Sequence, residues 1–385
     1  MLLSDDHIAV QDAVRAYVQD HIAPNAAHWD KHHQFPHEEL KGLAALGCYG
    51  VAVPPEWDGA GLDYLALALI LEEIAAGDGA TSTVVSVNNC PVCSILMAFG
   101  NDDQKQRFLK PLARGDMLGA FCLTEPHVGS EAGGLKTTAR RDGDHYVLDG
   151  VKQFITSGKN GDVAIVMAVT DKAAGKRGIS AFIVPTDTPG YQVARIEDKL
   201  GQHASDTAQI RFEQCRVPAA NRIGDEGQGL KIALSGLEGG RIGIASQAVG
   251  MARAAFEAAL AYSKDRSSFG QPIFQHQAVQ FKLADMATEL DAARLMIHRA
   301  AFKLDQKSPD ATMACAMAKR LATDTGFQVV NDALQLHGGY GYLKEYPIER
   351  YLRDLRVHQI LEGTNEIMRV IIARKLLSGD WPSNR

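Results

Sequence analysis

The chain has 385 residues, of which 46% are hydrophobic and 22% charged, and its formal net charge at pH 7 is -6. This length predicts two or three packed units rather than one core. Acidic and basic residues are mixed along the chain, which excludes a general nucleic-acid surface because such a surface needs a basic stripe. Only an isolated basic pocket for an anion stays open.

Membrane and redox signals are weak. No run approaches the roughly 18 apolar residues that span a bilayer. The segment 1–20 is acidic and amphipathic, unlike a signal or transit peptide, so we expect a cytoplasmic protein without a membrane partner. The six cysteines do not resemble a secreted disulfide framework and are expected to be reduced. Cys90 and Cys93 have redox-motif spacing without a βαβ context, which favours a structural role.

Four histidines, His28, His32, His33 and His37, lie close together in the sequence. They have no cysteine or spaced carboxylate beside them, so we interpret them as surface residues and predict no metal site.

Helical periodicity opens the chain. An apolar stripe over residues 10–18 follows the capping sequence at 4–6 and predicts a first helix. Residues 65–72 predict an amphipathic helix after a proline- and glycine-rich break at 54–61.

Between residues 121 and 226 the pattern changes to short β-rich runs at 146–148, 163–169, 179–184 and 210–212. Asp142-Gly143 and Asp149-Gly150 predict turns. Helical spacing returns after 227, clearest as one long helix over 279–304 and a second buried stripe over 244–255. We therefore expect an α+β protein with an N-terminal helical domain (1–120), a middle β domain (121–226) and a C-terminal helical bundle (227–385).

Several segments carry residues suited to a planar or phosphorylated ligand. The sequence has no G-x-G-x-x-G after a strand and no P-loop, so another kind of cradle is needed. The candidates are FCLTEPHVGS (121–130), KQFITSG (152–158), DRSSFG (265–270) and QLHGGYG (335–341). They combine hydroxyls, aromatic rings, a bidentate arginine and bare glycine backbone. Each alone is equally typical of an ordinary loop or strand end.

A single carboxylate near the C-terminus is the candidate base. Glu362 stands in QILEGTNE (359–366), among apolar neighbours and before a glycine. Burial disfavours a charged carboxylate and raises its pKa, which suits removal of a proton from carbon. A solvated helix face or a buried ion pair is the alternative interpretation of such a residue.

Together and in this order, these segments resemble the acyl-CoA dehydrogenase family of flavoproteins from end to end of the chain. The resemblance implies an α-helical N-terminal domain, a β-barrel-like middle domain and a C-terminal four-helix bundle. It also implies FAD-dependent α,β-dehydrogenation of an acyl-CoA to the 2-enoyl-CoA. Glu362 matches the family's base, which takes the α-proton while the β-hydrogen leaves as hydride to flavin N5.

Further site residues follow from the resemblance, position by position. Residues at the FAD-contacting positions are Phe121, Cys122, Leu123, Thr124, Gly129, Ser130, Phe154, Ile155, Thr156, Arg266, Phe269, Gln277, Gln335, Leu336, His337, Gly338, Gly339, Thr364, Asn365 and Glu366. Residues at the acyl-CoA-contacting positions are Ser130, Glu238, Arg241, Leu361, Gly363 and Arg374. Other positions match residues that reach the FAD of a neighbouring subunit, which implies a homotetramer built as a dimer of dimers; they are Arg266, Phe269, Gln277 and the segment from Gln335 to Gly339.

Two departures point to a subgroup. Phe154 stands where most members have tryptophan beside the flavin, and Leu361 stands where tyrosine often precedes the base. Both are shared with the isobutyryl-CoA dehydrogenases, the subgroup that the chain resembles most. Some members carry the base just before the arginine that Arg241 matches, and this chain has Gly240 there.

Alternatives stay open at this stage. One methylene is worth only about 1 to 3 kcal/mol of discrimination, so straight short-chain and 2-methylbutyryl thioesters remain candidate substrates. An acyl-CoA oxidase, a lyase-type relative and a non-catalytic acyl-CoA- or flavin-binding scaffold are the other functions considered. For a dehydrogenase, an electron-transferring flavoprotein is the expected electron acceptor.

Overall fold

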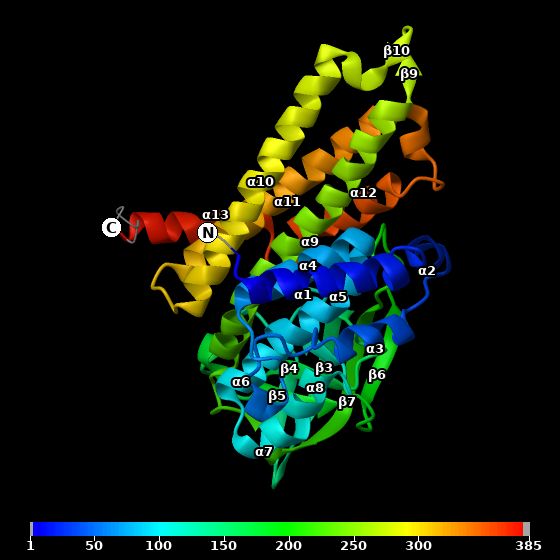
Figure 1. Ribbon diagram of the computed structural model, residues 1–385. Helices are drawn as coiled ribbons and strands as arrows, with labels where there is room; N and C mark the ends of the chain where they lie inside the picture. The colour runs from blue at the N-terminus through cyan, green and yellow to red at the C-terminus, as the bar shows by residue number, and fades with distance from the viewer. Residues whose placement is uncertain (1–2, 380–385) are drawn as a thin grey trace.

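The chain folds into a helical region, a β-sheet and a second helical region in that order (Figure 1). The computed structural model describes residues 3–379. This order confirms the predicted three-part fold. Helix gives way to strand between Arg114 and Gly119, and strand to helix between Ile223 and Gly229. On these transitions we propose domain boundaries at 1–120, 121–226 and 227–385.

The N-terminal region is built from short helices joined by π- and 3-10 turns. They are α1 (Asp5–Tyr17), α2 (Ala26–His32), α3 (His37–Ala45), α4 (Tyr64–Gly77), α5 (Gly79–Val87), α6 (Ser94–Phe99), α7 (Asp102–Gln104) and α8 (Lys110–Arg114). The Ser4 side chain accepts the His7 backbone N–H and caps α1, as the sequence predicts. Asp63 caps α4 in the same way, through the Ala66 N–H.

The helix α4 is the core of this region and not the amphipathic helix expected from its sequence. Every residue from Leu65 to Ala75 is buried. The helix α4 lies against α1 on one side and against the C-terminal helices α9 (Gly229–Asp265) and α10 (Gln277–Asp305) on others. A helix that is apolar on all sides has to be covered on all sides.

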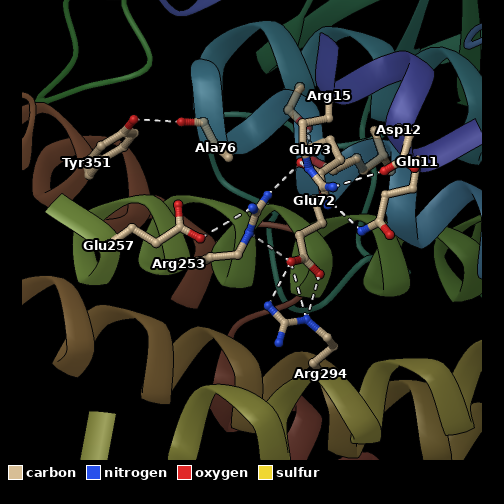
Figure 2. A network of polar contacts seen from close by, with 12 residues as sticks. Gln11, Asp12, Arg15, Glu72, Glu73, Ala76, Arg253, Glu257, Arg294 and Tyr351 are labelled. Atoms are coloured by element: carbon tan, nitrogen blue, oxygen red, sulfur yellow. Dashed lines mark hydrogen bonds and ion pairs between the residues drawn. The ribbon is translucent and has the colours of Figure 1, made fainter. Parts of the chain in front are cut away.

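Two buried carboxylates on α4 join the two helical regions (Figure 2). Glu73 accepts from Arg15 of α1 at 2.8 Å and from Arg253 of α9 at 2.7 Å. Glu72 pairs with Arg253 at 3.1 Å and with Arg294 of α10 at 2.8 Å. Burial opposes ionisation of Glu73, but the hydrogen bonds and charges of the two arginines outweigh it and lower its pKa.

The middle region is one eight-stranded sheet with strand order β6-β7-β3-β2-β4-β5-β8, and β1 pairs with β4 off this path. The strands are β1 (Gly119–Cys122), β2 (Thr138–Asp142), β3 (His145–Thr156), β4 (Val163–Val169), β5 (Ile179–Pro185), β6 (Tyr191–Ile196), β7 (Thr207–Pro218) and β8 (Arg222–Ile223). The four predicted β-rich runs fall in β3, β4, β5 and β7.

One of the two predicted turns is wrong. Asp142-Gly143 does turn between β2 and β3, where Gly143 has φ +62°. Asp149-Gly150 instead lies inside β3, at a shift of register against β7. A Cβ at Gly150 would come within 2.4 to 2.7 Å of Thr137 atoms, so this glycine permits a close crossing of chains rather than a reversal.

The C-terminal region contains three long helices, α9 (Gly229–Asp265), α10 (Gln277–Asp305) and α11 (Ala311–His337), followed by α12 (Ile348–Arg356) and α13 (Asn365–Leu377). The predicted long helix over 279–304 is α10. The two-stranded hairpin of β9 (Ser267–Ser268) and β10 (Gln271–Pro272) joins α9 to α10 at the far tip of the bundle, away from the sheet (Figure 1).

The stretch Gly79–Phe99 is long and apolar enough to cross a membrane, with a mean hydropathy of 1.4 over its most apolar window, and 72% of that window is buried inside the protein. It includes Pro91 and a non-helical Cys90. Burial of this kind is typical of a core helix.

Candidate active site

Glu362 lies in the turn between the 3-10 segment Val357–Gln359 and α13. Its φ is +55°, a left-handed value that is rare outside glycine, and Gly363 follows at φ +89°. The carboxylate projects onto α9, where a Cβ at Gly240 would meet Glu362 Oε1 at 2.1 Å. The missing side chain at Gly240 therefore makes the space that the carboxylate occupies.

The surroundings of Glu362 make its carboxyl group neutral in acid and ionised near neutrality. Burial raises its pKa from 4.5 to about 7, although the charges of Arg241 and Lys319 act in the opposite direction. Arg241 on α9 is 5% exposed, and its Nε has no hydrogen-bond partner among the described residues. Cys90 packs against Gly239 of α9. Burial raises the pKa of the Cys90 thiol, and the charge of Glu362 adds to this effect.

The two predicted flavin segments of the β domain lie side by side. Phe121 and Cys122 end β1 and Thr124 follows it, while Phe154 to Thr156 end β3. The Gln153 N–H donates to the Thr124 carbonyl at 2.8 Å. The side chains of Cys122 and Ile155 point into the core, at 0% and 1% exposure, so only their backbones remain to contact a ligand.

A buried ion pair that local sequence patterns do not predict lies between these two segments. Lys152 Nζ donates to Glu125 Oε1 at 2.8 Å and to the Leu123 carbonyl at 3.1 Å. The Glu125 carboxylate also accepts the backbone N–H groups of Lys136 and Thr137. Burial opposes its ionisation, but Lys152 and these donors outweigh that effect and lower the pKa of Glu125. The pair fixes the loop that carries Thr124.

The C-terminal cofactor candidates gather at the other end of the molecule. Arg266 and the run Leu336, His337, Gly338 and Gly339 line one pocket of about 550 Å³. Phe269, at the hairpin tip, is 96% exposed. Gln277 is exposed at the start of α10, and Gln335 is exposed in the last turn of α11. Within one chain these residues are not brought to the β-domain segments, because they lie at the ends of α9, α10 and α11 that meet at the tip of the bundle (Figure 1).

The remaining candidates lie in or next to the turn at residues 361–364, which is called the base turn after the candidate base Glu362. Leu361 and Gly363 flank Glu362, and Thr364 caps α13 by accepting the Ile367 N–H. Glu366 is exposed beside Arg369. Asn365 is 3% exposed, and its side chain binds Lys319, Thr323 and Asp324.

Two acyl-CoA candidates lie farther out. Glu238 accepts the hydroxyl of Thr312. Arg374 is exposed on α13, about 13 Å along the helix axis from Asn365.

The residues of the β domain fit FAD. The side-chain hydroxyls of Thr124 and Thr156 have no hydrogen-bond partner within residues 3–379, and the Ser157 hydroxyl is buried without one. Phe154 is 63% exposed, which leaves its ring free for a planar ligand. A Cβ at Gly129, beside exposed Ser130, would meet nothing within 4 Å, so backbone there is open to a phosphate. The donor set matches a ring with hydrogen-bonding edges and a diphosphate.

Comparisons with known proteins point to the same family along nearly the whole chain. Family models described as the acyl-CoA dehydrogenase N-terminal, middle and C-terminal domains match residues 4–116, 120–215 and 227–377. The chain is 45% identical over 379 residues to an isobutyryl-CoA dehydrogenase of Dictyostelium discoideum, covering 98% of this chain and 91% of that protein.

It is also 45% identical over 375 residues to a short-chain specific acyl-CoA dehydrogenase of Rattus norvegicus, covering 97% and 91%. The solved butyryl-CoA dehydrogenase of Megasphaera elsdenii is 40% identical, with a TM-score of 0.95 over 98% of this chain and 99% of that one.

Proposed function

Because the chain belongs to the acyl-CoA dehydrogenase family, as its motifs predict, we propose that it is an isobutyryl-CoA dehydrogenase with Glu362 as the base. Its general activity is FAD-dependent dehydrogenation of short-chain acyl-CoAs. The observation that carries the assignment of the base is the position of Glu362: a desolvated carboxylate in a left-handed turn, seated over Gly240 and facing two cations.

In the proposed reaction, Glu362 removes the α-proton of the thioester. Burial keeps the carboxylate basic enough for this task, and Arg241 and Lys319 stabilise its ionised form. When bound, FAD supplies the acceptor for the hydride that leaves the β-carbon. The proposed FAD-holding residues of the β domain are Thr124, Ser130 and Thr156. The backbone N–H of Glu362 is proposed to polarise the thioester carbonyl.

The preference for a branched acyl group is supported by two side chains. Phe154 is smaller than the tryptophan usual at its position, and Leu361 lacks the ring of tyrosine. Both leave lateral room for a methyl branch at the α-carbon. Replacing Phe154 by Trp is expected to reduce kcat/KM for isobutyryl-CoA relative to butyryl-CoA by about 10-fold or more. An unchanged ratio would favour a straight-chain enzyme.

Assembly and location belong to the same proposal. The separation of the hairpin-tip residues from the β-domain segments supports a homotetramer in which one subunit completes the FAD site of another. We further propose an electron-transferring flavoprotein as the electron acceptor and a cytoplasmic location. Analytical ultracentrifugation of the holoenzyme tests the tetramer, and rates with this acceptor against oxygen separate a dehydrogenase from an oxidase.

The base is tested with Glu362→Gln. This variant keeps the shape of the side chain and is expected to bind FAD and isobutyryl-CoA normally while losing anaerobic flavin bleaching. Stopped-flow absorbance measures the bleaching, and ligand titration of the flavin spectrum measures binding. If the variant bleached at a rate near that of the unmodified enzyme, the base would have to be another residue.

A further inference from the structure

Lys319 is a fully buried lysine behind the base turn. It lies on α11 among alanines and is 0% exposed. Its Nζ donates to the Gly363 carbonyl at 2.9 Å and to Asn365 Oδ1 at 2.9 Å. Both acceptors are neutral, and Lys319 forms no ion pair within residues 3–379.

A buried ammonium without a paired carboxylate is costly, so its position calls for a physical reason. A neutral donor would serve to hold a turn. The charged groups that face Lys319 come from three helices and the turn: Glu362 of the turn, Asp324 of α11 and Glu366 of α13 attract it, while Arg241 of α9 repels it. The buried His358 also faces Lys319, and burial together with the Lys319 charge lowers the pKa of this imidazole to about 3, so it stays neutral. Burial lowers the pKa of Lys319 to about 8, so it is still mostly charged at pH 7.

The turn that Lys319 holds is strained. Glu362 and Gly363 are successive left-handed residues, and a non-glycine residue persists in that region only when its surroundings fix it. The carbonyl of Gly363 is the acceptor for Lys319, so the ammonium fixes the peptide that follows the base. Asn365, the second acceptor, begins α13 and is itself anchored to Thr323 and Asp324.

We propose that Lys319 is a positioning residue for the dehydrogenation: its ammonium clamps the Glu362–Gly363 turn and presents positive charge to the base. The inference rests on the proposed role of Glu362. Only Arg241 and Lys319 act as cations on the Glu362 carboxylate among the described residues, and the Cys90 thiol also faces it. Without Lys319, the ionised base loses one of its two stabilising charges.

The test compares Lys319→Gln, which keeps donors without charge, with Lys319→Arg, which keeps charge. For Lys319→Gln we expect kcat to fall at least tenfold at pH 7 with KM changed less than threefold. We also expect the acidic limb of kcat/KM to move up by about one pH unit. Lys319→Arg is expected to keep the limb within a few tenths of a unit.

Lys199→Met is the matched control. Lys199 is also largely buried, donates to neutral acceptors on Ser205 and Thr207, and has a pKa lowered by burial to about 8, but it lies in the connection between β6 and β7. Lys199→Met should lower the Tm without moving the acidic limb of the kcat/KM pH profile. A merely structural role for Lys319 predicts the same pattern for Lys319→Gln, and that pattern would overturn the inference.

Glu362→Gln, measured in parallel, separates the two proposals. If it bleaches flavin normally, Glu362 is not the base and the inference about Lys319 falls with it. If it is inactive while Lys319→Gln keeps the unmodified kcat and limb, only the role of Lys319 is refuted. Should Lys319→Gln fail to fold, Lys319→Met, which also removes the charge, decides the question: the inference expects its acidic limb of kcat/KM to move up by about one pH unit, and an unmoved limb would overturn it.

Discussion

Gly240→Ala should inactivate the enzyme without unfolding it. The new Cβ would lie 2.1 Å from Glu362 Oε1 and 3.0 Å from its carboxylate carbon, whereas its next neighbour, the Cys90 carbonyl oxygen, lies at an acceptable 3.6 Å. The carboxylate must therefore retreat by more than about 1 Å to reach ordinary contact distance. A misplacement of that size lowers kcat by about 100-fold. Alanine also favours the helix over glycine by about 1 kcal/mol, so the Tm should hold or rise.

Gly236→Ala is the matched control, one turn earlier on α9. Its Cβ would meet Pro91 Cβ at 2.7 Å and Ile95 Cδ1 at 2.8 Å, which are core atoms that cannot swing away. Overpacking there should cost about 1 to 3 kcal/mol of stability and leave kcat per bound flavin unchanged. Stopped-flow flavin bleaching and thermal melts measure both variants. Normal bleaching in Gly240→Ala would refute the placement of the reactive carboxylate over this glycine.

Three further outcomes are expected. Because the pKa of Glu362 is raised by burial from 4.5 to about 7, kcat/KM should rise tenfold per pH unit below about 7 and level off above it. The folded state binds the Glu362 proton more tightly than the unfolded chain does, so protonation of Glu362 stabilises the fold below pH 4.5 and this stabilisation is lost as the pH rises through 7. Glu362→Gln should abolish this pH-dependent part of the free energy of unfolding, measured by urea melts. Lys152→Met leaves the Glu125 carboxylate buried without its partner, which should cost about 3 to 5 kcal/mol and speed FAD release, followed by flavin fluorescence; an unchanged release rate would contradict the role given to the pair. Arg253→Met should lower the free energy of unfolding by a similar 3 to 5 kcal/mol with kcat per flavin retained, and a loss under about 1 kcal/mol would contradict the stabilising role of the network in Figure 2.

Local patterns predicted the elements whose residues repeat at a regular spacing. The helices α1 and α10 follow directly from periodicity and β4 from an unbroken apolar run. Glu362 could be singled out because its neighbours are apolar. Asp149-Gly150 was misinterpreted because a turn dipeptide and a bulge look alike until the partner strand is known. Here the residue that requires glycine at position 150 is Thr137, which lies in the connection between β1 and β2.

The contacts of Lys319 could not be predicted from local patterns for a related reason. Lys319 occurs once in an alanine-rich helix, where a lysine usually extends to solvent. Its acceptors are supplied by Gly363 and Asn365, more than 40 residues later. A lone lysine at the buried spacing of a helix was the available signal, and only the packing of α13 onto α11 gives it meaning.

The carboxylate pair of α4 also bears on how the chain folds as it is made. Glu73 meets Arg253 after 180 further residues, and Glu72 meets Arg294 after 222. At a synthesis rate of about 5 to 20 residues per second, the first of these intervals lasts on the order of 10 to 40 seconds. During that time the newly made α4 segment carries acidic groups that lack these partners, so its final burial has to wait for the last third of the polypeptide. The N-terminal helices are therefore the first to be synthesised and among the last to be completed.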